Sequence, residues 1–153
     1  KQLTDSPGED WTPTWSPDGS LLAFASNRNG NWDIFVTRPD GTELRQVTDG
    51  QGDHWLPAWS PHGSTLAFAG NRDDNWDIFT VRPDGTELQQ VVTHTASDSE
   101  PVWSPDGSVL AFVRRPIGLS STLMFVELST GKVSQGNVDG FPTDWFEPTK
   151  NLD

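Results

Sequence analysis

The chain has 153 residues, the length of a single domain. It carries 22 acidic and 10 basic side chains, for a net charge of -12, and it contains no cysteine. The acidic balance argues against nucleic acid as a partner, because phosphate binding needs clustered Lys and Arg. The lack of cysteine excludes disulfides, thiol nucleophiles and cysteine-based zinc sites. No apolar run approaches the roughly 20 residues of a spanning helix, so we expect no membrane insertion.

A six-residue motif returns along the chain at a fixed interval. WSPDGS at Trp15–Ser20 recurs as WSPHGS at Trp59–Ser64 and as WSPDGS at Trp103–Ser108, 44 residues apart both times. A period of this size is typical of repeat proteins, in which each unit buries its faces against its neighbours. Because Pro restricts φ and Gly accepts a positive φ, the motif itself predicts a tight turn.

Each unit contains four short runs that predict β-strands. The first ends near the Trp of the motif, the second is apolar on both faces, and the third is rich in aromatic and β-branched residues. A second turn precedes the fourth run. In chain order the runs are Thr12–Ser16, Leu21–Ser26, Trp32–Thr37 and Leu44–Thr48; then Leu56–Ser60, Thr65–Gly70, Trp76–Val81 and Leu88–Val92; then Pro101–Ser104, Val109–Arg114, Leu123–Leu128 and Val133–Val138.

Four short antiparallel strands in every unit of this length match the blade of a β-propeller. We therefore predict an all-β chain that forms one partial propeller of about three four-stranded blades. The predicted blades cover residues 11–48, 55–92 and 101–138. Residues 1–5 and 141–148 are similar to single strands of further blades, and we expect them to help close the ring.

The motifs resemble the blade signature of the TolB-type β-propeller repeat family. That signature is a WSPDG turn, an apolar strand, and a D-I-F strand that leads to a final L-T. The second unit replaces the Asp of the turn with His62, and the third departs from the signature in its second hairpin. The resemblance implies a periplasmic or secreted bacterial protein, but it is specific for fold and not for function. In the first unit it rests on Trp15–Gly19, Leu22–Phe24, Asp33–Phe35 and Gln46–Thr48.

Three blades are too few to close a ring, since propellers have at least about four. Open blade faces would also expose more apolar surface than a soluble monomer usually shows. The resemblance implies a ring of six blades, so we expect self-association into a homodimer with three blades from each chain. The alternative is that the chain is a piece of a longer propeller.

Two loops rich in Asn and Asp, at 27–33 and 71–77, place oxygen donors two residues apart, as calcium loops do. The distal Glu of such loops is missing and most of the donors are neutral. A hairpin turn, in which Asn and Gly supply positive φ, is the stronger interpretation. We predict no metal and no cofactor, with a cation in these loops as the alternative.

The candidate ligand-binding residues lie at the start of the innermost strands, where a propeller's loops surround its channel. Trp beside carboxylates suits a peptide or a sugar, because aromatic residues are frequent at binding hot spots. Alternatively, Trp11 and Trp55 wedge between adjacent blades. The third unit has Ser99 and Glu100 here, which suits an uneven binding surface. The candidates are Glu9, Asp10, Trp11, Asp53, His54, Trp55 and Glu100.

Catalytic motifs are lacking. His54, His62 and His94 are scattered, there is no HExxH motif, and Gly118–Thr122 fails the G-x-S-x-G pattern at its last position. We therefore predict no catalytic residue and a non-enzymatic scaffold that docks a protein or peptide at an acidic channel. The alternatives are a carbohydrate-binding propeller that uses exposed Trp, and a half-propeller, natural or engineered, with only a structural role.

Overall fold

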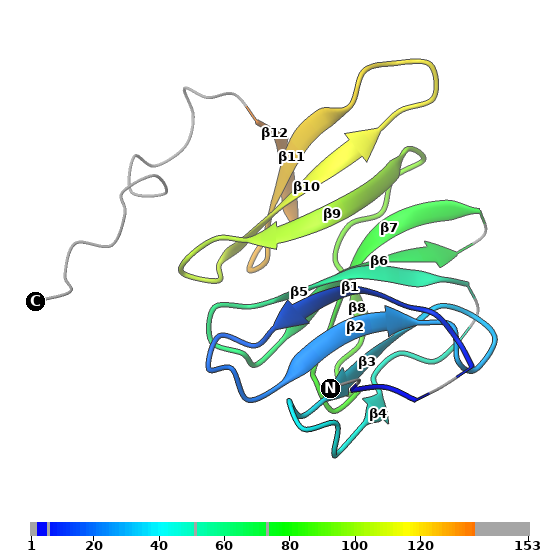
Figure 1. Ribbon diagram of the computed structural model, residues 1–153. Coiled ribbons are helices and arrows are strands. Elements are labelled where there is room, and N and C mark those ends of the chain that lie inside the picture. The colour runs from blue at the N-terminus through cyan, green and yellow to red at the C-terminus, as the bar shows by residue number, and fades with distance from the viewer. Residues whose placement is uncertain (1–2, 6, 51, 73, 137–153) are drawn as a thin grey trace, which may run out of the picture.

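The computed structural model describes residues 3–5, 7–50, 52–72 and 74–136, which contain strands and no helix. Twelve strands in this part of the chain form three antiparallel sheets of four strands, which follow one another in chain order (Figure 1). The all-β prediction with three four-stranded units is thereby confirmed. The strands are β1 (Asp10–Trp15), β2 (Leu22–Ser26), β3 (Asp33–Thr37) and β4 (Arg45–Gln46); β5 (His54–Trp59), β6 (Leu66–Arg72), β7 (Asn75–Val81) and β8 (Gln89–Gln90); and β9 (Ser97–Trp103), β10 (Val109–Arg115), β11 (Thr122–Glu127) and β12 (Lys132–Gln135).

The strand ends differ from the predicted ones mainly in the innermost and outermost strands. The innermost strand β9 begins at Ser97, before the predicted Pro101, because Asp98 and Ser97 still pair with β10. The outer strands β4 and β8 have two residues each. After β4 the Ile34 carbonyl accepts the N–H groups of both Val47 and Thr48, at 2.8 and 3.4 Å, so regular pairing stops there.

The terminal strands predicted for ring closure fall mostly beyond the structure. Residues 141–148, and residues 1 and 2, lie outside the described residues. Leu3, Thr4 and Asp5 are described and belong to no strand. Within the described ranges there is also no helix long and apolar enough to cross a membrane.

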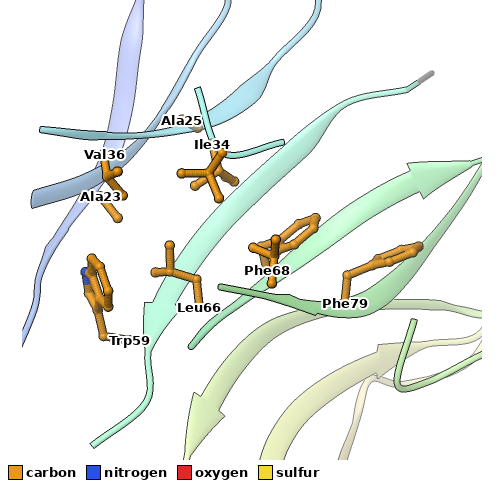
Figure 2. Close-up of a cluster of buried hydrophobic side chains, with 10 residues drawn as sticks. Ala23, Ala25, Ile34, Val36, Trp59, Leu66, Phe68 and Phe79 are labelled. Carbon is orange, nitrogen blue, oxygen red and sulfur yellow. The ribbon is translucent and has the colours of Figure 1, made fainter. Parts of the chain in front are cut away.

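Burial of apolar side chains between consecutive sheets holds the blades together. Figure 2 shows Trp59 and Leu66 of the second blade facing Ala23 and Val36 of the first. We call the contact between two consecutive blades a joint. The second joint, between the second and third blades, buries a similar cluster that includes Phe112. Each blade is thus apolar on both faces of its middle strands, as predicted for strands that lie between two layers.

In the first and third blades, the turn after the innermost strand is closed by its own side chains. In the first blade the Ser16 carbonyl accepts the Gly19 N–H at 2.8 Å, and Gly19 has a φ of 70°. The Asp18 carboxylate accepts the Ser16 hydroxyl at 2.6 Å and the Ser20 N–H at 3.0 Å. Ser104, Asp106 and Ser108 repeat this arrangement in the third blade. These bonds explain why the motif is Ser-Pro-Asp-Gly-Ser.

We expect the Asp carboxylates of these turns to become protonated only at unusually low pH. The Ser16 hydroxyl, followed by the Ser20 N–H and hydroxyl, lowers the pKa of Asp18 from 3.8 to about 2. The Ser104 hydroxyl does the same for Asp106, whose pKa is also about 2. Because both pKa values are depressed, the stabilising contribution of the carboxylates is complete above 3.8 and is lost as the pH falls towards 2.

An NMR pH titration of the carboxyl carbons measures this directly. In Ser16→Ala the pKa of Asp18 is expected to rise towards its ordinary value, while that of Asp106 stays near 2. Ser104→Ala is the matched control and is expected to give the reverse pattern. A wild-type Asp18 that titrates near 3.8 would contradict the turn geometry.

Candidate functional site

The innermost strands share an irregularity at equivalent positions. Thr12, Leu56 and Glu100 have positive φ values of 51°, 57° and 58°. At the same points the register between the innermost strand and its neighbour shifts. Such values are uncommon outside glycine and occur often at binding sites. The bulges bring Thr12 and Leu56 into the wall of one pocket.

His54 and Asp53 are engaged within the protein. The buried His54 ring has its Nδ1 2.8 Å from Asp33 Oδ1 and packs edge-on against Phe68 at 5.3 Å. Thr48 also donates to Asp33, at 3.0 Å. The Asp53 carboxylate accepts the Trp32 N–H at 3.1 Å. These two candidates therefore connect the second blade to the first.

The candidates of the first blade, Glu9, Asp10 and Trp11, are all exposed. Arg28 and Asp10 form an ion pair at 2.8 Å. Burial alone would raise the pKa of Asp10, but hydrogen bonds from Ser26, Thr4 and Arg28 outweigh it and lower the pKa. Trp11 is 54 % exposed, and its indole N–H donates to Glu9 Oε2 at 3.3 Å.

Trp55 contributes to packing and also to a pocket wall. Its ring lies 4.1 Å from that of Trp32, centroid to centroid, across the first joint. This is the wedge between blades that the sequence left as an alternative. At the second joint the equivalent of Trp32 is Trp76, but the equivalent of Trp55 is Ser99. The stacked pair is therefore not repeated, and Trp76 faces a pocket.

This pocket has a volume of about 630 Å³ and takes its lining from all three blades. The lining is mostly apolar, with one guanidinium group at Arg115. That guanidinium donates to the Ser99 hydroxyl and to the Glu100 carboxylate. The buried Oγ1 of Thr12 has no hydrogen-bond partner among the described residues. The lining residues are Thr12, Trp55, Leu56, Ala69, Trp76, Ser97, Ser99 and Arg115.

Of the candidates chosen from the sequence, the structure places Trp55 in the pocket wall and Glu100 beside it, through Arg115. It does not bring Asp10, Trp11, Asp53 or His54 into the lining. Sequence reasoning missed Trp76 and Arg115. The sequence did contain a signal for Trp76. Trp76 faces the third unit, in which Ser99 replaces the Trp that wedges between blades.

The oxygens of the Asn- and Asp-rich loops are used inside the blades. Asp33 accepts bonds from Thr48 and Gln46, and Asp77 accepts from Gln90 at 2.8 Å. Asn27 Oδ1 accepts the Glu9 N–H at 2.7 Å. Among the residues that the structure describes, which exclude residue 73, no three His, Asp or Glu side chains gather as a metal site would require.

Comparison with known proteins gives a consistent family. The model of the TolB β-propeller domain matches residues 41–141. The Tol-Pal system protein TolB of Syntrophus aciditrophicus (strain SB) is 47 % identical over 45 residues, which are 29 % of this chain and 10 % of that protein. The structure of putative TolB from Agrobacterium tumefaciens is 25 % identical with a TM-score of 0.76, over 87 % of this chain and 50 % of that one.

An enzyme with the same fold is also similar. An oligogalacturonate lyase from Vibrio parahaemolyticus has a TM-score of 0.66 at 17 % identity, over 87 % of this chain and 42 % of the lyase. Identity this low shows the fold alone. The chain thus spans about half or less of the longer proteins that it matches.

Proposed function

Because the chain belongs to the TolB β-propeller domain family, we propose that it is a non-enzymatic scaffold that docks a protein or peptide in the pocket beside Trp55 and Trp76. The pocket is concave and mostly apolar, with a few polar groups, as binding sites usually are. Its described lining contains no histidine and no carboxylate, and a guanidinium is a poor general base. These features support binding over catalysis. The family also supports a periplasmic location for the chain.

The observation that carries the proposal is the unmatched Trp76. At the first joint an indole, that of Trp55, covers Trp32 at 4.1 Å. At the second joint Ser99 leaves the corresponding space as a pocket, lined on one side by Trp76. The Trp32–Trp55 contact at the first joint supports an aromatic ring as the group that would fill this space. The proposed ligand is a peptide segment whose aromatic side chain stacks on Trp76.

The charge of the protein favours basic residues on either side of that aromatic anchor. The net charge of -12 attracts cationic partners over distances comparable with the Debye length. Near the pocket the carboxylates are paired: Asp98 with Arg114 at 2.8 Å, and Glu100 with Arg115. The acidic surface therefore guides the approach, while the aromatic contact supplies most of the affinity.

Peptides selected from a random display library against the purified protein test this function. We expect the selected peptides to share an aromatic residue flanked by Lys or Arg. Isothermal titration should show binding weakened at least about tenfold by Trp76→Ala, since removing an aromatic hot-spot residue typically costs 2 kcal/mol or more. Trp11→Ala, which removes a Trp outside the pocket, is the matched control and should bind as the wild type does.

The variant Ser99→Trp fills the pocket and separates occupancy from folding. It restores the residue that the first two units carry, so the protein should stay folded while peptide binding is lost. Peptides that bind Ser99→Trp and Trp76→Ala as tightly as the wild type would overturn the proposal.

A carbohydrate is the second candidate ligand, because the exposed indole of Trp11 is free to stack on a sugar ring. A glycan array distinguishes the two: sugar retention that Trp11→Ala abolishes would favour this reading.

For the open ends of the three-blade array, we propose closure by a second copy of the chain into a six-bladed homodimer.

A further inference from the structure

The two joints between blades within the chain repeat the same contacts. At the first joint the indole N–H of Trp59 donates to the Thr14 carbonyl at 3.2 Å. At the second, Trp103 donates to the Ala58 carbonyl at 3.0 Å. In both cases the donor lies in the later blade and the acceptor on the innermost strand of the earlier blade.

A second contact is repeated in the turns. Pro17 of the first blade lies over Gly63 of the second, with its Cδ 3.6 Å from where a Cβ on Gly63 would be. Pro61 lies over Gly107 in the same way, at 3.5 Å. Each joint therefore contains the same two contacts: a Trp indole N–H that donates to a carbonyl, and a Pro that lies over a Gly.

The first and third blades each carry one half of such a joint. Trp15, at the position of Trp59, is 53 % exposed, whereas Trp59 is 8 % exposed. Val102, at the position of Thr14 and Ala58, is 61 % exposed. No described atom lies within 4 Å of a Cβ built on Gly19, the equivalent of Gly63 and Gly107. The donor half lies on the first blade and the acceptor half on the third.

We propose that two copies of the chain join these halves. The Trp15 indole of one copy packs on the third blade of the other and donates to the Val102 carbonyl, while Pro105 of that second copy lies over Gly19. The same joint forms twice, so the ring closes. This inference rests on the proposed closure by a second copy and specifies the contacts that make it.

A second copy is the occupant that fits because it presents both missing halves in the geometry that the chain already uses twice. The four joint positions, Trp15, Gly19, Val102 and Pro105, are uncharged. Two chains of net charge -12 can therefore meet here without placing carboxylates opposite each other at these contacts. An unrelated partner would have to carry the same turn and the same exposed carbonyl.

Sedimentation equilibrium of the purified chain tests the joint. The wild type should be a dimer, and Trp15→Ala should raise the dissociation constant at least about a hundredfold, because each dimer loses the Trp at both joints. Trp15→Phe keeps a ring without the N–H and should give an intermediate value.

Leu44→Ala is the matched control. Leu44 is 43 % exposed, and its equivalent Leu88 is 41 % exposed although its blade has neighbours on both sides, so this position lies outside the joints. Its dissociation constant should equal that of the wild type. A monomeric wild type overturns both the joint and the ring closure. A dimer that Trp15→Ala leaves unchanged overturns the joint only.

A second measurement avoids any variant that fails to fold. Hydrogen exchange of the tryptophan indole N–H groups, followed by NMR, should show Trp15 protected to a degree similar to Trp59 and Trp103. Exchange of Trp15 at the rate of an exposed indole would overturn the joint. The peptide pocket lies within one chain, so peptide binding by Trp15→Ala reports on the docking function separately.

Discussion

Replacing Trp59 with alanine is expected to lower the free energy of unfolding by about 3–5 kcal/mol. Trp59 is 8 % exposed, belongs to the core between the first two blades, and donates its indole N–H to the Thr14 carbonyl. The substitution leaves a cavity against Leu66, Ala23 and Val36 and removes a hydrogen bond across the joint. Because domains are stable by only about 5–15 kcal/mol, the variant should lose a large fraction of its stability.

Urea unfolding followed by circular dichroism, at one protein concentration for all variants, measures this loss. Ile117→Ala removes an apolar side chain that is 98 % exposed and should cost less than about 1 kcal/mol. Equal losses for the two variants would show that the first joint does not depend on the buried Trp. That result would contradict the stacked-blade core.

Replacing Asp98 with alanine should be similarly severe, at about 3–5 kcal/mol. Asp98 is completely buried, and Arg114 donates to both of its oxygens at 2.8 Å. The Arg114 side chain is itself only 12 % exposed and lies over the Phe112 ring. Without Asp98, a guanidinium would be left buried and unpaired, which costs much more than the pair itself contributes.

The double variant Asp98→Leu with Arg114→Met tests that explanation, since replacing both partners with apolar residues is often nearly neutral. We expect it to recover most of the stability that Asp98→Ala loses. Glu43→Ala breaks the exposed pair with Arg38 and serves as the control, with an expected change below about 1 kcal/mol. If the double variant is as unstable as Asp98→Ala, the loss of stability does not come from the unpaired charge.

The fold could be predicted from the sequence because the same pattern of turns and apolar runs occurs three times. The spacing of the Trp-Ser-Pro turns, the apolar runs such as Leu66–Ala69, and the second turns locate four strands in each unit. The ends of the outer strands could not be predicted, because the bifurcated acceptor at Ile34 ends the regular pairing of β4 after two residues. The bulges were hidden for another reason: Thr12, Leu56 and Glu100 share no side-chain chemistry, and none is glycine.

The site was predictable only in part. Trp55 was chosen because it is aromatic and stands at the start of an innermost strand, and it does line the pocket. Trp76 was missed because its exposure depends on what another unit lacks, namely the indole that Ser99 replaces. His54 was chosen as a binding residue, yet it is buried against Asp33, a contact between residues 21 apart that only the stacking of blades creates.

Light scattering of the unmodified chain tests the central claim most directly. That claim is that stacked blades of this family need a complete ring. We expect a mass twice the 16.9 kDa of one chain, constant over the micromolar range. A single-chain mass at the same concentrations, with the strand content of the structure retained, would contradict it.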